Sequence, residues 1–173
     1  MLRLILALCL VFFSLNQQAA AEGISSQFFP VTGETRCPVC GMFVGKYQQW
    51  LTQIRMSDGS TAAFDGVKDM AAYYFSPQDF GAAKGAVVKD IAVQDYYSQA
   101  WTDGRRAFYV LGSDIYGPMG HELIPFSNRE GAENFQKDHG SSKILSFVEI
   151  TEELIEALRK GLKMKGHTMP GMR

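Results

Sequence analysis

The same strand–helix pattern occurs twice in the sequence, and this repetition constrains the fold more than any other feature. Segments 64–73 and 126–135 each start with a phenylalanine that ends a predicted strand and continue with a helix-capping residue. In both segments an aromatic residue follows nine positions after that phenylalanine. Two predicted strands precede each segment and one follows it. The repetition predicts an α+β fold of two small ββαβ-like units, in which each antiparallel sheet is covered by one helix.

Apolar–polar alternation and turn residues predict the individual elements. Predicted strands lie at residues 50–56, 61–64, 87–93, 96–100, 107–111, 121–126 and 144–150. Asp58-Gly59 supplies a hairpin turn in the first unit, and the glycine- and proline-rich residues 113–120 predict a turn-rich loop in the second. Helix-capping side chains are predicted at Asp65, at Ser127 or Asn128, and at Thr151, which starts a C-terminal helix.

The composition is that of a globular chain and argues against several classes of function. Of the 173 residues, 46% are hydrophobic and 20% charged, which excludes a disordered protein. The chain has 17 Lys and Arg against 18 Asp and Glu, so no excess of positive charge is present to bind nucleic acid. The sequence contains no GxSxG, HExxH, P-loop or dinucleotide-binding motif, and we therefore predict that the protein is not an enzyme.

The N-terminal residues have the pattern of a bacterial secretory signal. Arg3 precedes an apolar run at 4–15, and small residues ending at Ala21 form a cleavage site. We therefore expect a soluble periplasmic protein without a membrane span. Cys9 does not fit a lipoprotein junction, because a leucine precedes it, so no lipid anchor is expected. The expected organisation is a signal peptide at 1–21, one domain at 22–160 with similar halves at about 37–93 and 101–150, and a flexible tail at 161–173.

Two cysteines remain in the expected mature chain, three positions apart in Cys37-Pro38-Val39-Cys40-Gly41-Met42. They are too few and too close together to form a disulfide framework. A CxxC segment lets two thiolates converge on one soft ion, and the Met42 thioether is a ligand that Cu(I) favours and zinc seldom uses. A Cu(I)-binding thiolate pair is favoured, while a structural zinc clip, a thioredoxin-like redox pair and a plain disulfide remain alternatives.

Methionine and histidine residues outside the predicted core extend this pattern. Met56 and Met70 fit the apolar positions of the first unit and are predicted core residues. Met119 and His121 instead stand close together among glycine and proline, which makes them candidate ligands of a soft metal. The tail adds four possible auxiliary copper ligands within nine positions, namely Met164, His167, Met169 and Met172.

Three motifs, CPVCGM at 37–42, FDGVKDM at 64–70 and GPMGHELIPF at 117–126, resemble in this order the nitrous oxide reductase accessory protein (NosL) family. The resemblance extends from about Arg36 to Ile150. It implies a pair of ββαβ-type units and a periplasmic Cu(I)-binding protein that helps deliver copper to the multicopper centres of nitrous oxide reductase. Delivery would involve a membrane complex with an ATP-binding cassette transporter and a periplasmic solenoid protein.

The resemblance also implies which residues contact copper. They are Cys37, Cys40, Met119 and His121, with Met42 as a further option, whereas the methionine-rich tail lies beyond the resemblance. Family members are commonly lipoproteins anchored through a cysteine at the signal junction, where this chain has Ala21-Glu22. We therefore predict a released Cu(I) chaperone, and a periplasmic CxxC thiol–disulfide oxidoreductase is the alternative.

Overall fold

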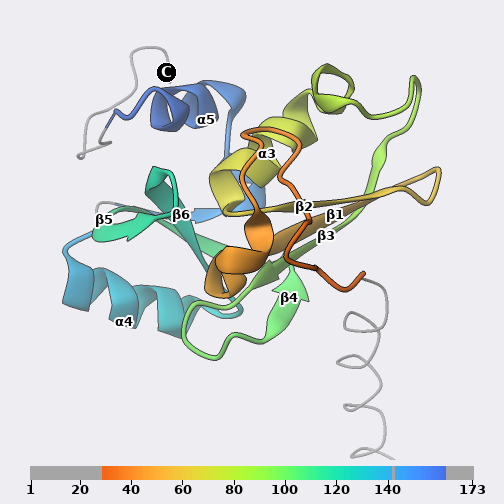
Figure 1. Cartoon of the computed structure of the whole chain (residues 1–173). Coiled ribbons are helices and arrows are strands. Elements are labelled where there is room, and N and C mark those ends of the chain that lie inside the picture. The colour runs from red at the N-terminus through yellow and green to blue at the C-terminus, as the bar shows by residue number, and fades with distance from the viewer. Residues whose placement is uncertain (1–28, 142, 163–173) are drawn as a thin grey trace, which may run out of the picture.

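Two antiparallel sheets and three α-helices make up residues 29–141 and 143–162, the part of the chain described by the computed structural model (Figure 1). The first sheet has the strand order β2-β1-β3-β4 and the second has the order β6-β5-β7. The strands are β1 (Thr52–Met56), β2 (Thr61–Phe64), β3 (Val88–Gln94), β4 (Trp101–Asp103), β5 (Phe108–Gly117), β6 (Gly120–Phe126) and β7 (Lys143–Ser146). The predicted α+β class is confirmed.

Both units have the same connectivity, as the repetition in the sequence predicts. β1 lies between β2 and β3, and β5 likewise lies between β6 and β7. α3 (Val67–Phe75) connects β2 to β3, and α4 (Arg129–His139) connects β6 to β7. α5 (Glu152–Arg159) follows the second unit. Short 3₁₀ helices complete the described chain: η1 (Val44–Lys46), η2 (Gln48–Trp50), η3 (Pro77–Phe80) and η4 (Phe147–Glu149).

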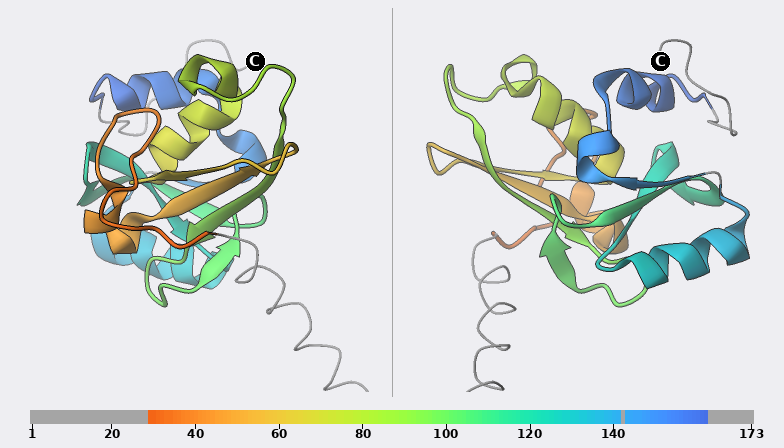
Figure 2. Two further views of the ribbon diagram at one scale, coloured as in Figure 1. Left: turned by 45° about the vertical axis from the view of Figure 1, so that its right-hand side comes forward. Right: turned by 180° about the vertical axis from the view of Figure 1, so that it is seen from behind.

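The two units share one hydrophobic core. Ile54 and Phe64 of the first unit belong to the same buried cluster as Tyr109 and Leu123 of the second. Phe135 of α4 packs in a second cluster with the alternate residues of β5 and β6. Figure 2 shows the resulting layers, with α3 beside α5 and with α4 below the second sheet. Each large apolar side chain buried in this way contributes roughly 1.5–3 kcal/mol, so separating the units would be costly.

Several local predictions are confirmed. Asn128 caps α4 by accepting a hydrogen bond from the amide of Gly131 (2.9 Å). Thr151 caps α5 through the amide of Leu154 (3.3 Å). Met56 and Met70 are fully buried in the shared core, as expected for methionines that fill apolar space.

The prediction of a loop at 113–120 is wrong, because this segment forms the end of a β-hairpin. β5 continues to Gly117, which pairs directly with Gly120 at the start of β6. Only Pro118 and Met119 remain as a two-residue turn, and Gly120 has a φ of +90° that favours glycine. The glycine and proline residues that suggested a loop are therefore the residues that a tight turn requires.

Two predicted strands also need correction. Residues 96–100 are a turn, because the buried Asp95 carboxylate accepts hydrogen bonds from the amides of Tyr97 (3.1 Å) and Ser98 (2.8 Å). β4 begins only after this turn. The strand predicted at 144–150 ends at Ser146, whose amide donates to the Glu149 carboxylate (2.7 Å) and so begins η4.

Two of the predicted segments lie largely outside the described residues. These are the signal peptide at 1–21 and the tail, including Met164, His167, Met169 and Met172. Among the helices that the structure does describe, none is both long enough and apolar enough to cross a membrane.

Candidate metal centre

The CxxC segment forms a closed loop that holds both thiols. The amide of Cys37 donates to the carbonyl of Met42 (2.9 Å), and the amide of Gly41 donates to the carbonyl of Cys37 (2.9 Å). Gly41 has a φ of +78°, which glycine adopts without steric cost. Cys37 is buried and Cys40 is half-buried. The backbone of this loop therefore fixes where the two thiols lie.

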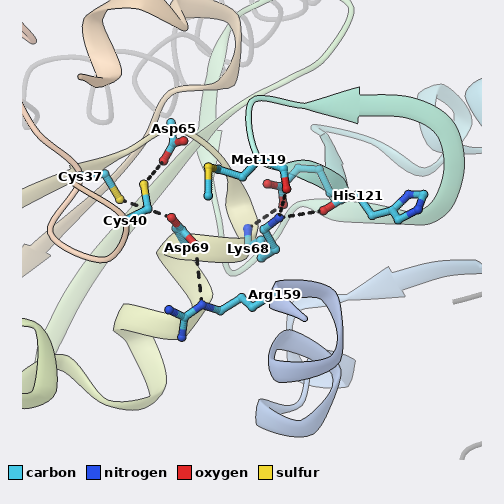
Figure 3. A network of polar contacts seen from close by, with 9 residues as sticks. Cys37, Cys40, Asp65, Lys68, Asp69, Met119, His121 and Arg159 are labelled. Atoms are coloured by element: carbon cyan, nitrogen blue, oxygen red, sulfur yellow. Dashed lines mark hydrogen bonds and ion pairs between the residues drawn. The ribbon is translucent and has the colours of Figure 1, made fainter. Parts of the chain in front are cut away.

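Two carboxylates face the thiols and complete a cysteine–aspartate cluster of Cys37, Cys40, Asp65 and Asp69 (Figure 3). The Cys37 thiol donates to Asp69 Oδ2 (3.5 Å), and the Cys40 thiol donates to Asp65 Oδ1 (3.3 Å). One possible ligand atom from each residue lies within 4.8 Å of the other three. Asp65 Oδ2 is buried and has no hydrogen-bond partner among the described residues. An unpaired buried oxygen is costly, so it marks a place where an additional group can bind.

Burial keeps both thiols protonated at neutral pH. Burial, with a smaller contribution from the negative charge of Asp69, raises the pKa of Cys37 to about 12 against the opposing backbone hydrogen bonds. The pKa of Cys40 is also raised, again mainly by burial. Thiols in this state donate hydrogen bonds to the carboxylates. They are poor nucleophiles, because the thiolate is the reactive form.

Asp65 does not have its predicted role, and Asp69 has a contact beyond the helix start. The prediction that Asp65 caps α3 is wrong, because Gly66 is the N-cap and the Asp65 carboxylate is turned toward Cys40. Asp69 does lie in the first turn of α3, where a negative charge interacts favourably with the helix dipole. It also faces Arg159 of α5, with 4.0 Å between Asp69 Oδ1 and Arg159 Nε. The C-terminal helix therefore ends close to the cluster.

The β5–β6 turn brings the Met119 side chain toward this cluster from the second unit. In Figure 3 the Met119 thioether points toward the cysteine pair, whereas the His121 imidazole points away from it. The His121 ring instead lies against the ring of Tyr116, with 4.8 Å between their centroids. Met119 is 49% exposed, so its side chain is also accessible to solvent.

Lys68 and Glu122 connect the same turn to α3, although both residues are buried. The Lys68 ammonium donates to the carbonyls of Met119 (2.8 Å) and His121 (3.1 Å). Glu122 Oε1 accepts from the amides of Lys68 (2.7 Å) and Leu123 (2.9 Å). Desolvation raises the pKa of Glu122 to about 8, although the positive charge of Lys68 opposes the shift. The polar surroundings of the cysteine–aspartate cluster thus extend across both units.

Comparison with known proteins now identifies the family. The NosL family model matches residues 28–155, which include every residue of the cluster. The chain belongs to the NosL family. A curated NosL relative, the "Copper-binding lipoprotein NosL" of Achromobacter cycloclastes, is 31% identical over 147 residues, covering 79% of this chain and 75% of that protein.

One solved NosL structure has a similar fold. The crystal structure of the copper chaperone NosL from Shewanella denitrificans superimposes with a TM-score of 0.62 at 23% identity, covering 73% of this chain and 96% of that one. The solution structure of apo-NosL from Achromobacter cycloclastes gives a TM-score of 0.46 at 28% identity, covering 60% of this chain and 87% of that one. The first of these similarities supports the NosL fold described above.

The predicted NosL site residues do not all lie together. Cys37 and Cys40 are adjacent, Met119 points toward them, and the ring of His121 points elsewhere (Figure 3). Met42 is half-buried, and its carbonyl closes the CxxC loop. Which of these residues bind a metal stays a prediction.

Residue-type reasoning missed four polar side chains around the thiols. Asp65 was expected only to cap the helix, although its spacing of four from Asp69 at a helix start places the two carboxylates near each other. Glu122 interrupts the apolar run of a predicted strand, which was a usable signal. Lys68 gave no such signal, because a lysine on a helix is usually exposed.

Proposed function

We propose that this NosL-family protein is a periplasmic Cu(I) chaperone that binds its cargo through Cys37, Cys40 and Met119. One observation carries the proposal: a thioether from the second unit points toward the buried thiol of Cys37 and the half-buried thiol of Cys40 in the first. Thiolate and thioether sulfur are the soft ligands that favour Cu(I) over harder ions. The name of the curated relative, a copper-binding lipoprotein, supports the same metal.

The residues around the thiols fit such a cargo. Asp65 and Asp69 hold the protonated thiols by accepting their hydrogen bonds, and each thiol must lose its proton to become a ligand. Carboxylate oxygen is a hard ligand that binds Cu(I) less well than sulfur, so we assign the aspartates to the surroundings of the site. We do not include His121 and Met42 in this set of ligands. Either residue could bind the copper ion during its transfer to a partner.

The structure disfavours a thiol–disulfide oxidoreductase, the alternative function. A catalytic CxxC needs at least one thiol with a lowered pKa, usually in electropositive surroundings. Here the pKa values of both thiols are raised, and carboxylates face them. We therefore propose a carrier that performs no catalysis.

Transfer by ligand exchange follows from the position of Met119. The cysteines are buried or half-buried, whereas Met119 is half-exposed at the turn. A soft ligand from an acceptor can replace the thioether while the thiolates still hold the ion.

We propose nitrous oxide reductase and its membrane copper-delivery transporter complex as the partners. Copper-loaded protein should raise the copper content of purified copper-free nitrous oxide reductase above that reached with an equal amount of chelated Cu(I), and equal copper contents would contradict this assignment.

Replacing Met119 by leucine should weaken Cu(I) binding about 10–100-fold, or by about 1.4–2.8 kcal/mol, because it removes one soft ligand and leaves both thiols. Competition with a Cu(I) chelator under anaerobic, reducing conditions measures the affinity. The matched control is Met56→Leu, which changes a buried core methionine in the same way. If both variants bind as the unchanged protein does, Met119 is not a ligand.

Removing residues 161–173 should slow copper transfer to an acceptor several-fold while changing equilibrium affinity little. The tail contains four soft or borderline ligands, and the helix that precedes it ends near the cluster through Arg159. Stopped-flow transfer to a chromophoric Cu(I) acceptor measures the rate. A chain that keeps its length but carries Met164→Leu, Met169→Leu and Met172→Leu together with His167→Gln should behave as the deletion does. Transfer at the original rate in both variants would show that the tail takes no part.

A further inference from the structure

The buried residues Lys68 and Glu122 have no evident role in binding the metal directly. We propose that they form a clamp between α3 and the β5–β6 turn, which holds Met119 over the cysteine pair and so positions it for Cu(I). The inference rests on the proposed function and adds two positioning residues to it. The clamp joins the two units where the Met119 side chain of the second points toward the cysteine pair of the first (Figure 3).

Lys68 fixes the backbone on both sides of the glycine in the turn. Its ammonium donates to the carbonyls of Met119 and His121, which flank Gly120. Lys68 is only 3% exposed, so these two bonds replace hydration that the ammonium has lost. The next residue, Asp69, accepts the thiol hydrogen bond of Cys37. One turn of α3 therefore contacts both halves of the candidate site.

Glu122 holds the β5–β6 turn against the start of α3 through hydrogen bonds of its own. Its Oε1 accepts from the amide of Lys68, one of the free amides at the start of α3, and from the amide of Leu123. A Cβ atom at Gly66 would lie 2.3 Å from Glu122 Oε2, and a Cβ at Gly117 would lie 3.1 Å from Glu122 Cβ. Glycine at both positions therefore makes room for this side chain, which is 4% exposed.

Such a clamp has a physical purpose at a methionine ligand. The methionine side chain has three rotatable bonds, and Met119 lies in a turn of two residues that is half-exposed. Without backbone constraints, this turn would have to become ordered when copper binds, and the entropy lost in that step would weaken copper binding. Polar partners that orient a metal ligand change metal affinity 10–100-fold in other proteins. The clamp holds the turn in its ordered conformation before the metal binds.

A double-mutant cycle in the full chain tests the inference. Lys68→Met keeps a side chain of similar length and removes the ammonium, and we expect Cu(I) affinity to fall about 10–100-fold. In a Met119→Leu background the same change should cost less than about twofold, because the residue being positioned is gone. Lys89→Met, which removes an exposed lysine on β3, is the control for charge. An unchanged affinity for Lys68→Met, or an equal loss in both backgrounds, would overturn the clamp.

Hydrogen exchange of the copper-free protein provides a readout that does not depend on metal. Lys68→Met should speed exchange of the backbone amides at 119–123 more than tenfold and leave those of α4 unchanged. Glu122→Gln keeps an oxygen acceptor, so the amides at 119–123 should exchange slowly in this variant. In Glu122→Met the same amides should exchange fast. Slow exchange at the turn in both Lys68→Met and Glu122→Met would overturn the inference. If the unchanged protein fails to bind Cu(I), the proposed function fails, while hydrogen exchange still decides whether the clamp exists.

Discussion

Replacing either Cys37 or Cys40 by serine is expected to lower the affinity for Cu(I) by about two orders of magnitude. Structural zinc sites with four ligands release about 10–16 kcal/mol, or about 3 kcal/mol for each ligand, and we expect the same order for a thiolate bound to Cu(I). A serine hydroxyl is smaller, harder and not ionised at neutral pH, so it cannot replace the thiolate. It can still donate a hydrogen bond to the carboxylate that each thiol contacts, so the fold should persist. Anaerobic competition with a Cu(I) chelator measures the affinity.

Val39→Ser is the matched control for these variants. It places a hydroxyl in the same loop, at a half-buried position, and removes neither thiol. Its affinity should stay within a few-fold of that of the unchanged protein. Should the two cysteine variants also bind within a few-fold, the CxxC segment would not be the copper site, and the assignment of Met119 would lose its basis.

Copper affinity should rise steeply with pH, by about a hundredfold between pH 6 and pH 7. In the copper-free protein both thiols are protonated, since burial raises the pKa of Cys37 to about 12 and raises that of Cys40 as well. Binding through two thiolates releases two protons, and each contributes a factor of about ten per pH unit. Higher pH favours proton release and therefore favours the loaded form. Competition titrations across this range, corrected for the protonation of the chelator, measure the slope.

The cysteine variants supply the internal check for this slope. Cys37→Ser leaves one thiol, so its slope should fall to about one factor of ten per pH unit. A slope near zero in the unchanged protein would mean that the metal does not bind through thiolates. A slope that stays the same after Cys37→Ser would show that Cys37 is not a ligand.

Local chemistry made most of the fold predictable. Apolar alternation and the glycine turn at Asp58-Gly59 locate the first hairpin, and side-chain caps such as Asn128 locate helix starts. These signals work because partners within a few residues satisfy them. The Asp95 turn escaped prediction because it depends on a buried carboxylate that also accepts from Ser127, 32 residues away.

The candidate site was only partly predictable, for a similar reason. The CxxC pair and Met119 were suggested by residue type. The aspartates were not, because Asp65 could have capped the helix and instead contacts a thiol 25 residues away. The orientation of His121 depends on strand register: once the turn has two residues, His121 pairs with Tyr116 and its ring lies against the tyrosine ring. The prediction of a loop at residues 113–120 left out this pairing, so the direction of the His121 ring could not be predicted.

In the proposed site, ligands from both units bind one ion, and this would link carriage of the metal to completion of folding. A chain with only its first unit formed would offer the CxxC pair without the turn that contributes Met119. A ligand that binds only the folded state stabilises it by about 4 kcal/mol at a thousandfold excess over its dissociation constant. Loaded protein should therefore resist unfolding and proteolysis better than empty protein. An incompletely folded copy would hold copper more weakly than an intact one, so copper would collect in the intact molecules.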